Sequence, residues 1–111
     1  MARYLLLALN GPTNGDGHED ALNRWYEEVH LPAFKKISGI RSARRYKVMQ
    51  GRVPGLAEIW PYVAAYEIET DDLAAVSAQL AQSMQEFHPA LDRTKSAFIR
   101  AIQIAGDDYE P

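Results

Sequence analysis

Four stretches of the chain have the apolar or alternating pattern that predicts a β-strand. They are residues 2–10, 40–50, 61–69 and 97–105, and the first is an apolar run that ends in Asn-Gly-Pro. Along 40–50, one predicted face carries Ile40, Ser42, Arg44, Tyr46 and Val48, and the other carries Arg41, Ala43, Arg45 and Lys47. Along 61–69, one predicted face carries Tyr62, Ala64, Tyr66 and Ile68.

The segment after the first strand predicts a helix that begins near His18 and runs to about Ile37. Pro32 lies inside this helix and has no N–H to donate to the carbonyl of Glu28. We therefore expect a kink or a break there, and we expect Gly39 to follow the end of the helix.

A second helix is predicted after residues 70–72 (Thr-Asp-Asp), which can cap its first turn. Its inner stripe is Leu73, Val76, Leu80 and Met84. Residues 51–55 read as a turn, residues 89–93 as a short helical turn, and residues 107–111 as a loose tail.

The resulting order is β-α-β-β-α-β, which is typical of an α+β, ferredoxin-like sandwich. In that fold a four-stranded antiparallel sheet carries both helices on one face. Residues 5–9 and 98–104 are apolar on both sides, so the second face also needs a cover. The simplest cover is another copy of the chain, and we expect a homodimer whose sheets pack face to face.

Composition narrows the function classes. We expect residues 1–111 to form a single domain, and the chain has no cysteine for disulfide or thiolate chemistry. Its net charge of −3 does not indicate a nucleic-acid partner, although residues 35–52 are basic and lack acidic side chains. No segment approaches the length of a membrane span, so we expect a cytoplasmic protein with no membrane partner.

Tyr26 and His30 are the first candidates for chemistry. They lie four residues apart, so the tyrosine stacks over the histidine on one helix face. Leu22, Val29 and Ala33 place that face toward the interior. A histidine can both take and give a proton near neutral pH, and a tyrosine hydroxyl can orient a substrate oxygen.

Three short patterns resemble the EthD-like proteins of the dimeric α+β barrel superfamily. They are Trp25-Tyr26-x-x-x-His30-x-Pro32, Gly39-Ile40-x-x-Ala43-x-Arg45-Tyr46, and Tyr62-x-Ala64-x-Tyr66-Glu67. The resemblance implies a barrel of two four-stranded sheets, with a ligand cleft between sheet and helices in each subunit. It also implies that a histidine at this point of the first helix faces the cleft. Relatives include enzymes and accessory proteins, so the fold alone does not settle function.

The second strand offers an arginine on each face. If the face of Arg44 and Tyr46 meets the helices, Arg44 could pair with a carboxylate or enolate oxygen. If that face instead meets the dimer partner, Arg45 takes the role. The pattern alone does not fix which face meets which layer.

Aromatic residues around the third strand complete the candidate site. Trp60, Tyr62 and Tyr66 suit the walls of a cleft for a flat ligand, and His88 is a candidate from a loop. The three histidines have no metal-ligand spacing, and no glycine pattern for a dinucleotide or nucleophile elbow is present. We therefore expect neither a metal nor a cofactor.

These observations predict a small-molecule-binding protein or enzyme of a catabolic or secondary pathway. Its chemistry would be cofactor-free proton transfer of the isomerase, cyclase or decarboxylase type, with His30 moving the proton. A non-catalytic accessory or ligand-binding protein is the alternative. Haem binding, with His30 or His88 as axial ligand, is a weaker one.

Overall fold

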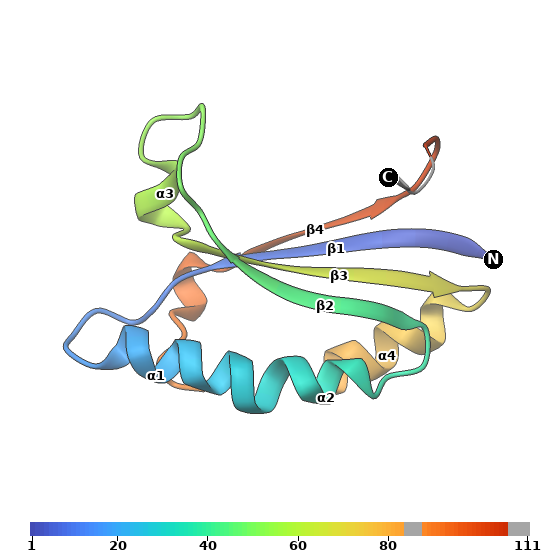
Figure 1. Cartoon of the computed structure of the whole chain (residues 1–111), viewed down its shortest axis with the longest axis horizontal. Coiled ribbons are helices and arrows are strands. Elements are labelled where there is room, and N and C mark those ends of the chain that lie inside the picture. Colours follow the sequence, from blue (N-terminus) through green and yellow to red (C-terminus); the bar gives the residue numbers. More distant parts are fainter. Residues whose placement is uncertain (84–87, 107–111) are drawn as a thin grey trace, which may run out of the picture.

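The computed structural model of the chain describes residues 1–83 and 88–106, and its centre is a four-stranded sheet of order β2-β3-β1-β4 (Figure 1). All three pairs of neighbouring strands are antiparallel. In chain order the elements are β1 (Ala2–Asn10), α1 (His18–Trp25), a π-helical turn η1 (Tyr26–His30), α2 (Leu31–Lys35), β2 (Ile40–Lys47), α3 (Leu56–Ile59), β3 (Tyr62–Thr70), α4 (Leu73–Ser83), a 3-10 turn η3 (Arg93–Lys95) and β4 (Ala97–Ile102). The predicted β-α-β-β-α-β order is confirmed, with α1, α2 and α4 beneath one face.

The core lies between this face and the helices. Strand register places Leu6 opposite Tyr66, so both side chains point to the helix layer. There they meet Leu22 and Phe34 of the first helical segment, and the Phe34 and Tyr66 ring centroids are 4.8 Å apart. Burying each of these large side chains contributes roughly 1.5–3 kcal/mol, which fixes the helix layer against the sheet.

The first helix widens from α to π geometry just before the proline, where the sequence had predicted a kink or a break. The five residues of η1 form a π turn in which the Leu31 N–H donates to the carbonyl of Tyr26. Pro32 then lies in the first turn of α2, directly after the π turn, and it has no N–H to donate to a carbonyl of that turn. The interruption therefore takes the form of one widened turn, and this turn carries both Tyr26 and His30.

The second helix begins as predicted. The Asp72 carboxylate accepts the N–H of Ala75, which caps the first turn of α4, and Val76 and Leu80 are buried. Its predicted continuation to Met84 and the predicted tail at 107–111 lie outside the described residues.

A β-bulge corrects the predicted faces of β2. Ile40 pairs with Ile68, but the next paired residue is Ser42, opposite Glu67, so Arg41 is the extra residue. The bulge places Ile40 on the helix-facing side, whereas the strict alternation had predicted it beside Ser42. From Ser42 onward the predicted alternation holds, and the strand ends at Lys47 rather than at residue 50.

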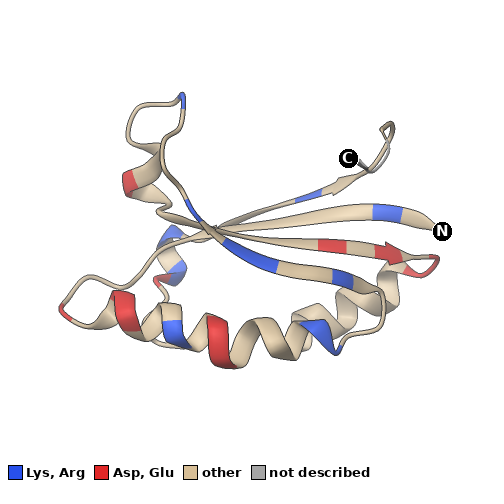
Figure 2. Ribbon diagram, in the orientation of Figure 1, with Lys and Arg blue, Asp and Glu red and all other residues tan. Residues whose placement is uncertain are grey.

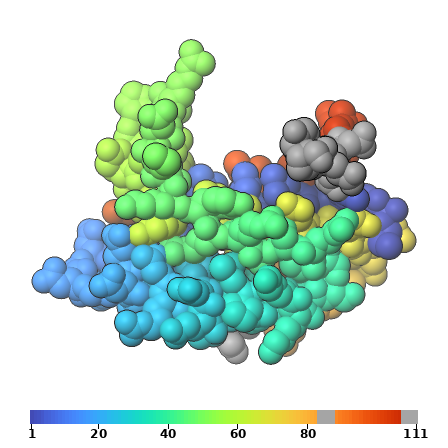
Figure 3. Space-filling view, viewed as in Figure 1, coloured from blue at the N-terminus to red at the C-terminus, as the bar shows by residue number. Residues whose placement is uncertain are grey.

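The connection between β2 and β3 contains α3, which the turn predicted at residues 51–55 did not anticipate. Residues 48–61 form an arm whose base is closed by a hydrogen bond from the Val48 N–H to the Pro61 carbonyl. The Trp60 indole N–H donates to the carbonyl of Lys95 and ties the arm to the body. Figures 1 and 3 show the arm rising on the side of the sheet that has no helices.

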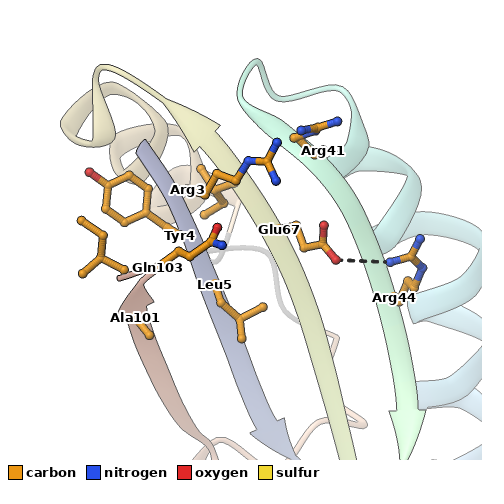
Figure 4. A pocket seen from close by; sticks show the side chains of 10 residues that line it. Arg3, Tyr4, Leu5, Arg41, Arg44, Glu67, Ala101 and Gln103 are labelled. Atoms are coloured by element: carbon orange, nitrogen blue, oxygen red, sulfur yellow. Dashed lines mark ion pairs between the residues drawn. The ribbon is translucent and has the colours of Figure 1, made fainter. Parts of the chain in front are cut away.

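That helix-free side, the open face, is largely apolar. Leu5, Tyr46 and Ile99 are 37, 50 and 53% exposed there. A shallow hollow of about 550 Å³ lies toward one end, and Figure 4 shows Arg3, Leu5 and Glu67 in it, with Arg44 joined to Glu67. The predicted second apolar face is therefore present.

Candidate functional site

Tyr26 lies at the start of the π turn, and its side chain is buried between helix and sheet. Its hydroxyl accepts a hydrogen bond of 2.7 Å from the side-chain amide of Asn10, at the end of β1. Burial raises the pKa of Tyr26, against the opposing effects of Asn10 and the nearby Arg45 cation. The phenol is therefore protonated at neutral pH and free to donate its own proton.

His30 lies one turn further along, inside a group of aromatic rings. Its imidazole stacks on Trp25 with centroids 4.4 Å apart, contacts Phe34 at 4.2 Å, and meets Tyr26 edge-on at 5.0 Å. The side chain is 5% exposed, and burial lowers its pKa to about 4. His30 is thus a neutral imidazole at pH 7.

Arg45 is the arginine that faces the helices. Its guanidinium carbon lies 4.3 Å from the centroid of the Tyr26 ring and 4.0 Å from that of the Tyr62 ring. Its Nη1 donates to the side-chain oxygen of Asn23 on α1. The Nε and Nη2 atoms are buried and have no hydrogen-bond partner among the described residues.

Tyr62 connects this arginine to the start of α1. The Tyr62 hydroxyl donates to Glu19 Oε1 at 2.7 Å and accepts from Asn23 Nδ2 at 3.4 Å. Burial, together with the hydrogen bond to Glu19, raises the pKa of Tyr62. Two phenols and one guanidinium therefore stand side by side, with a carboxylate at the rim.

These side chains line a cavity of about 530 Å³, which we call the helix–sheet cavity. Its lining residues are Glu19, Asn23, Tyr26, Glu27, Leu31, Arg45, Tyr46, Lys47 and Tyr62. Figure 2 shows basic residues along β2 and both acidic and basic residues along the first helical segment. A small molecule could occupy this space between α1 and the ends of β2 and β3.

The structure brings some predicted site residues to this cavity and places others elsewhere. Tyr26, Tyr46 and Tyr62 line it. Arg44 lies on the open face, 3.5 Å from Glu67, so of the two arginines it is Arg45 that meets the helices. Tyr66 is buried in the core beside Phe34.

The remaining candidates are not among the lining residues of the helix–sheet cavity. His30 lies behind Tyr26, in the aromatic group. Trp60 belongs to the arm. The Nδ1 atom of His88 accepts the N–H of Ala90, and its ring lies 6.2 Å from that of Trp25.

The polar residues of the site that were missed from the sequence include Asn10, Glu19 and Asn23. A signal was present for two of them, because Glu19, Asn23 and Tyr26 follow one another at helical spacing and so share a face. The sequence contains no comparable signal for Asn10, because an asparagine at the end of an apolar strand is usually interpreted as a turn residue.

The chemistry open to this arrangement is the recognition of an oxygen-bearing ligand. Phenol hydroxyls and guanidinium N–H groups donate hydrogen bonds, and they stabilise negative charge that develops on a ligand oxygen. Among the described residues no cluster of three or more histidine, aspartate or glutamate side chains has a geometry that could hold a metal ion.

Comparison with known proteins supports the fold. No family model matches the chain, and no curated protein matches it. Solved structures do match. A dimeric ferredoxin-like protein of unknown function from Jannaschia sp. CCS1 has a TM-score of 0.65 at 12% identity, covering 88% of this chain and 96% of the other.

Two further neighbours name families. A DABB family protein with a ferredoxin-like fold from Mesorhizobium loti has a TM-score of 0.62 at 8% identity, covering 95% of this chain and all of the other. An ethyl tert-butyl ether D (EthD) family protein from Bacillus halodurans has a TM-score of 0.57 at 15% identity, covering 98% of this chain and all of the other. At these identities the likeness shows the fold, and it confirms at that level the resemblance to EthD-like, dimeric α+β barrel proteins. In the described part of the chain, no helix is long and apolar enough to cross a membrane.

Proposed function

We propose that this chain acts in the cytoplasm and binds a small organic metabolite of a catabolic or secondary pathway in the helix–sheet cavity. The observation that carries the proposal is Arg45. A half-buried cation on the cavity wall keeps two buried nitrogen atoms without a partner among the described residues. Buried polar groups are normally paired, so a ligand that supplies an acceptor gives this arrangement a purpose.

Catalysis by cofactor-free proton transfer is the second candidate, and the titratable wall of the cavity favours it. Tyr26 and Tyr62 can donate to a ligand oxygen, and Glu19 accepts a hydrogen bond from the Tyr62 hydroxyl. Isomerisation, cyclisation or decarboxylation needs such donors and a base.

We propose His30 as the proton carrier of that second candidate. As a neutral imidazole, it can accept a proton. Tyr26 lines the cavity and its ring contacts the imidazole of His30, whereas His30 is not a lining residue. The role therefore requires the imidazole to reach the cavity past the Tyr26 ring. The enclosure of His30 by Trp25 and Phe34 favours the non-catalytic reading, which is why ligand binding is the primary proposal.

We also propose that a second copy of the chain covers the open face. Leu5, Tyr46 and Ile99 leave apolar surface exposed on one side of the sheet, and such patches mark interaction sites. The Jannaschia neighbour is dimeric, which supports the same assembly for this fold.

A ligand screen followed by amide chemical shifts tests the proposed function. Aromatic and lactone compounds are added to the ¹⁵N-labelled protein. We expect binders to shift the amide signals of residues 19–27 and 45–47 together, because these segments line the cavity. If binding shifts only signals of the open face, or if no compound of the panel binds, the helix–sheet cavity is not the ligand site.

A further inference from the structure

The hydrogen bonds of Arg45 are incomplete in a specific way. A guanidinium group has five N–H donors in one plane. The Nη1 atom is engaged by Asn23, whereas Nε and Nη2 are buried and have no acceptor within the part of the chain that the structure describes. The missing partner is therefore a hydrogen-bond acceptor at one edge of the guanidinium.

The two tyrosine rings restrict where that acceptor can lie. Tyr26 and Tyr62 each lie within 4.3 Å of the guanidinium carbon, and their rings interact with the cation. Such ring contacts offset part of the cost of burying the charge but leave the N–H edge unsatisfied. An acceptor must then approach within the plane of the guanidinium, and because Nε and Nη2 are buried in this structure, the side chains that cover this edge must move to admit it. A carboxylate or another oxyanion fits such an edge best.

The other charges of the cavity do not supply that acceptor. Its lining includes Glu19, Glu27 and Lys47 as well as Arg45, and these three others are exposed. The carboxylate of Glu19 is held at the rim, where it accepts the Tyr62 hydroxyl at 2.7 Å. Exposed charges are screened by solvent, so the half-buried arginine exerts the strongest pull on a ligand inside.

We propose that the ligand carries an oxyanion, either a carboxylate or a phenolate or enolate oxygen, on an aromatic or conjugated framework, and that Arg45 binds this oxygen. The inference rests on the proposed function and names the class of ligand. Tyr26 and Tyr62 supply flat walls for the framework. Glu19 competes with the ligand for the arginine, because its negative charge already acts on the Arg45 side chain.

Matched probes that differ only in charge test the proposal. We would titrate 2-naphthoate and 2-naphthamide, and benzoate and benzamide, into the ¹⁵N-labelled full chain. Each carboxylate is expected to bind roughly tenfold or more tightly than its amide, since hydrogen bonds to a charged group are the stronger ones. The shifted signals should again be those of residues 19–27 and 45–47.

Variants identify the group responsible. Arg45→Met keeps an unbranched side chain between the two rings and should abolish the preference for the carboxylate. Arg45→Lys keeps the charge without the planar fork and should retain only part of it. Arg24→Met is the matched control, because Arg24 is exposed on α1 and is not a lining residue. It removes the same charge and should leave the preference intact.

Glu19→Gln is an independent test, because it should change the affinity for the carboxylate in the opposite direction from Arg45→Met. Removal of the competing carboxylate should tighten the binding of 2-naphthoate and leave 2-naphthamide unchanged. Equal binding of acid and amide inside the cavity, or an unchanged preference in Arg45→Met, would overturn the oxyanion inference and leave the proposed function standing. The absence of cavity shifts with all four probes would contradict both.

Discussion

Arg45 and Tyr26 come from different layers of the fold, and the guanidinium carbon lies 4.3 Å from the centre of the phenol ring. One residue is on β2 and the other on the π turn of the first helical segment. Their contact places a cation and a phenol on the wall of one cavity. The site therefore depends on how the helix is widened before Pro32 as much as on the strand.

Pro32→Ala tests that dependence. The substitution restores an N–H that can donate to the carbonyl of Glu28, and this favours a regular α-helix over the π turn. We expect the free energy of unfolding to rise by about 1 kcal/mol, measured by urea denaturation. We also expect weaker binding of 2-naphthoate, because Tyr26 would turn relative to Arg45. Unchanged affinity would mean that the proline only marks a helix boundary.

The buried His30 makes stability depend on pH. Its pKa is about 4 in the folded chain and has the ordinary value of 6.5 when unfolded. Its contribution is fully present above pH 6.5 and is lost as the pH falls toward 4, because the unfolded chain takes up the proton first. Between pH 7.5 and 4.5 we expect a loss of roughly 2–3 kcal/mol from this group.

Urea denaturation at several pH values measures this loss. His30→Gln should remove most of the slope between pH 4.5 and 6.5, whereas His18→Gln, at the first residue of α1, should keep it. The same slope in His30→Gln and the wild type would show that the imidazole is not the group responsible.

His30→Gln also separates the two candidate functions. If the chain is an enzyme and His30 carries the proton, turnover should fall roughly 100-fold or more, and Tyr26→Phe should cost less because the ring remains. Circular dichroism serves as the control for folding. Full turnover in His30→Gln would remove the imidazole from catalysis.

Assembly can be tested with neighbouring residues on opposite faces of β4. Ile99 pairs with Leu7 on the open face, and Phe98 pairs with Ala8 on the helix-facing side of this edge strand. We expect the wild type to be a dimer by light scattering and Ile99→Lys to be a monomer, because a charge in a packed apolar interface is costly. Phe98→Lys, at a residue that is 60% exposed, should remain a dimer. A wild-type chain that scatters as a monomer of 12.5 kDa would contradict the proposed assembly.

The strand pattern predicted most of the fold because alternation reports directly on burial. Tyr62, Ala64, Tyr66 and Ile68 were expected to share a face, and all four are buried under the helices. The predicted face of Ile40 was wrong because one extra residue, Arg41, shifts the register of β2 against β3 without changing the local sequence pattern.

The site was predictable only in part. Tyr26 and Tyr62 could be expected from helix and strand spacing, but the choice between Arg44 and Arg45 depends on which face meets the helices. Tertiary packing decides that question, and the strand pattern alone does not contain it. His30 was expected to face a cleft, and the structure places it among aromatic rings behind Tyr26.

The side-chain Nε–H signal of Arg45 is the most direct measure of the central claim, that a ligand oxyanion completes this arginine. With selective arginine labelling, the signal can be followed while 2-naphthoate is added, with 2-naphthamide as the neutral control. We predict that the carboxylate shifts this signal and slows its exchange with water, and that the amide does neither. An Arg45 signal that is unchanged by saturating 2-naphthoate, in a sample whose cavity amides do shift, would contradict the claim.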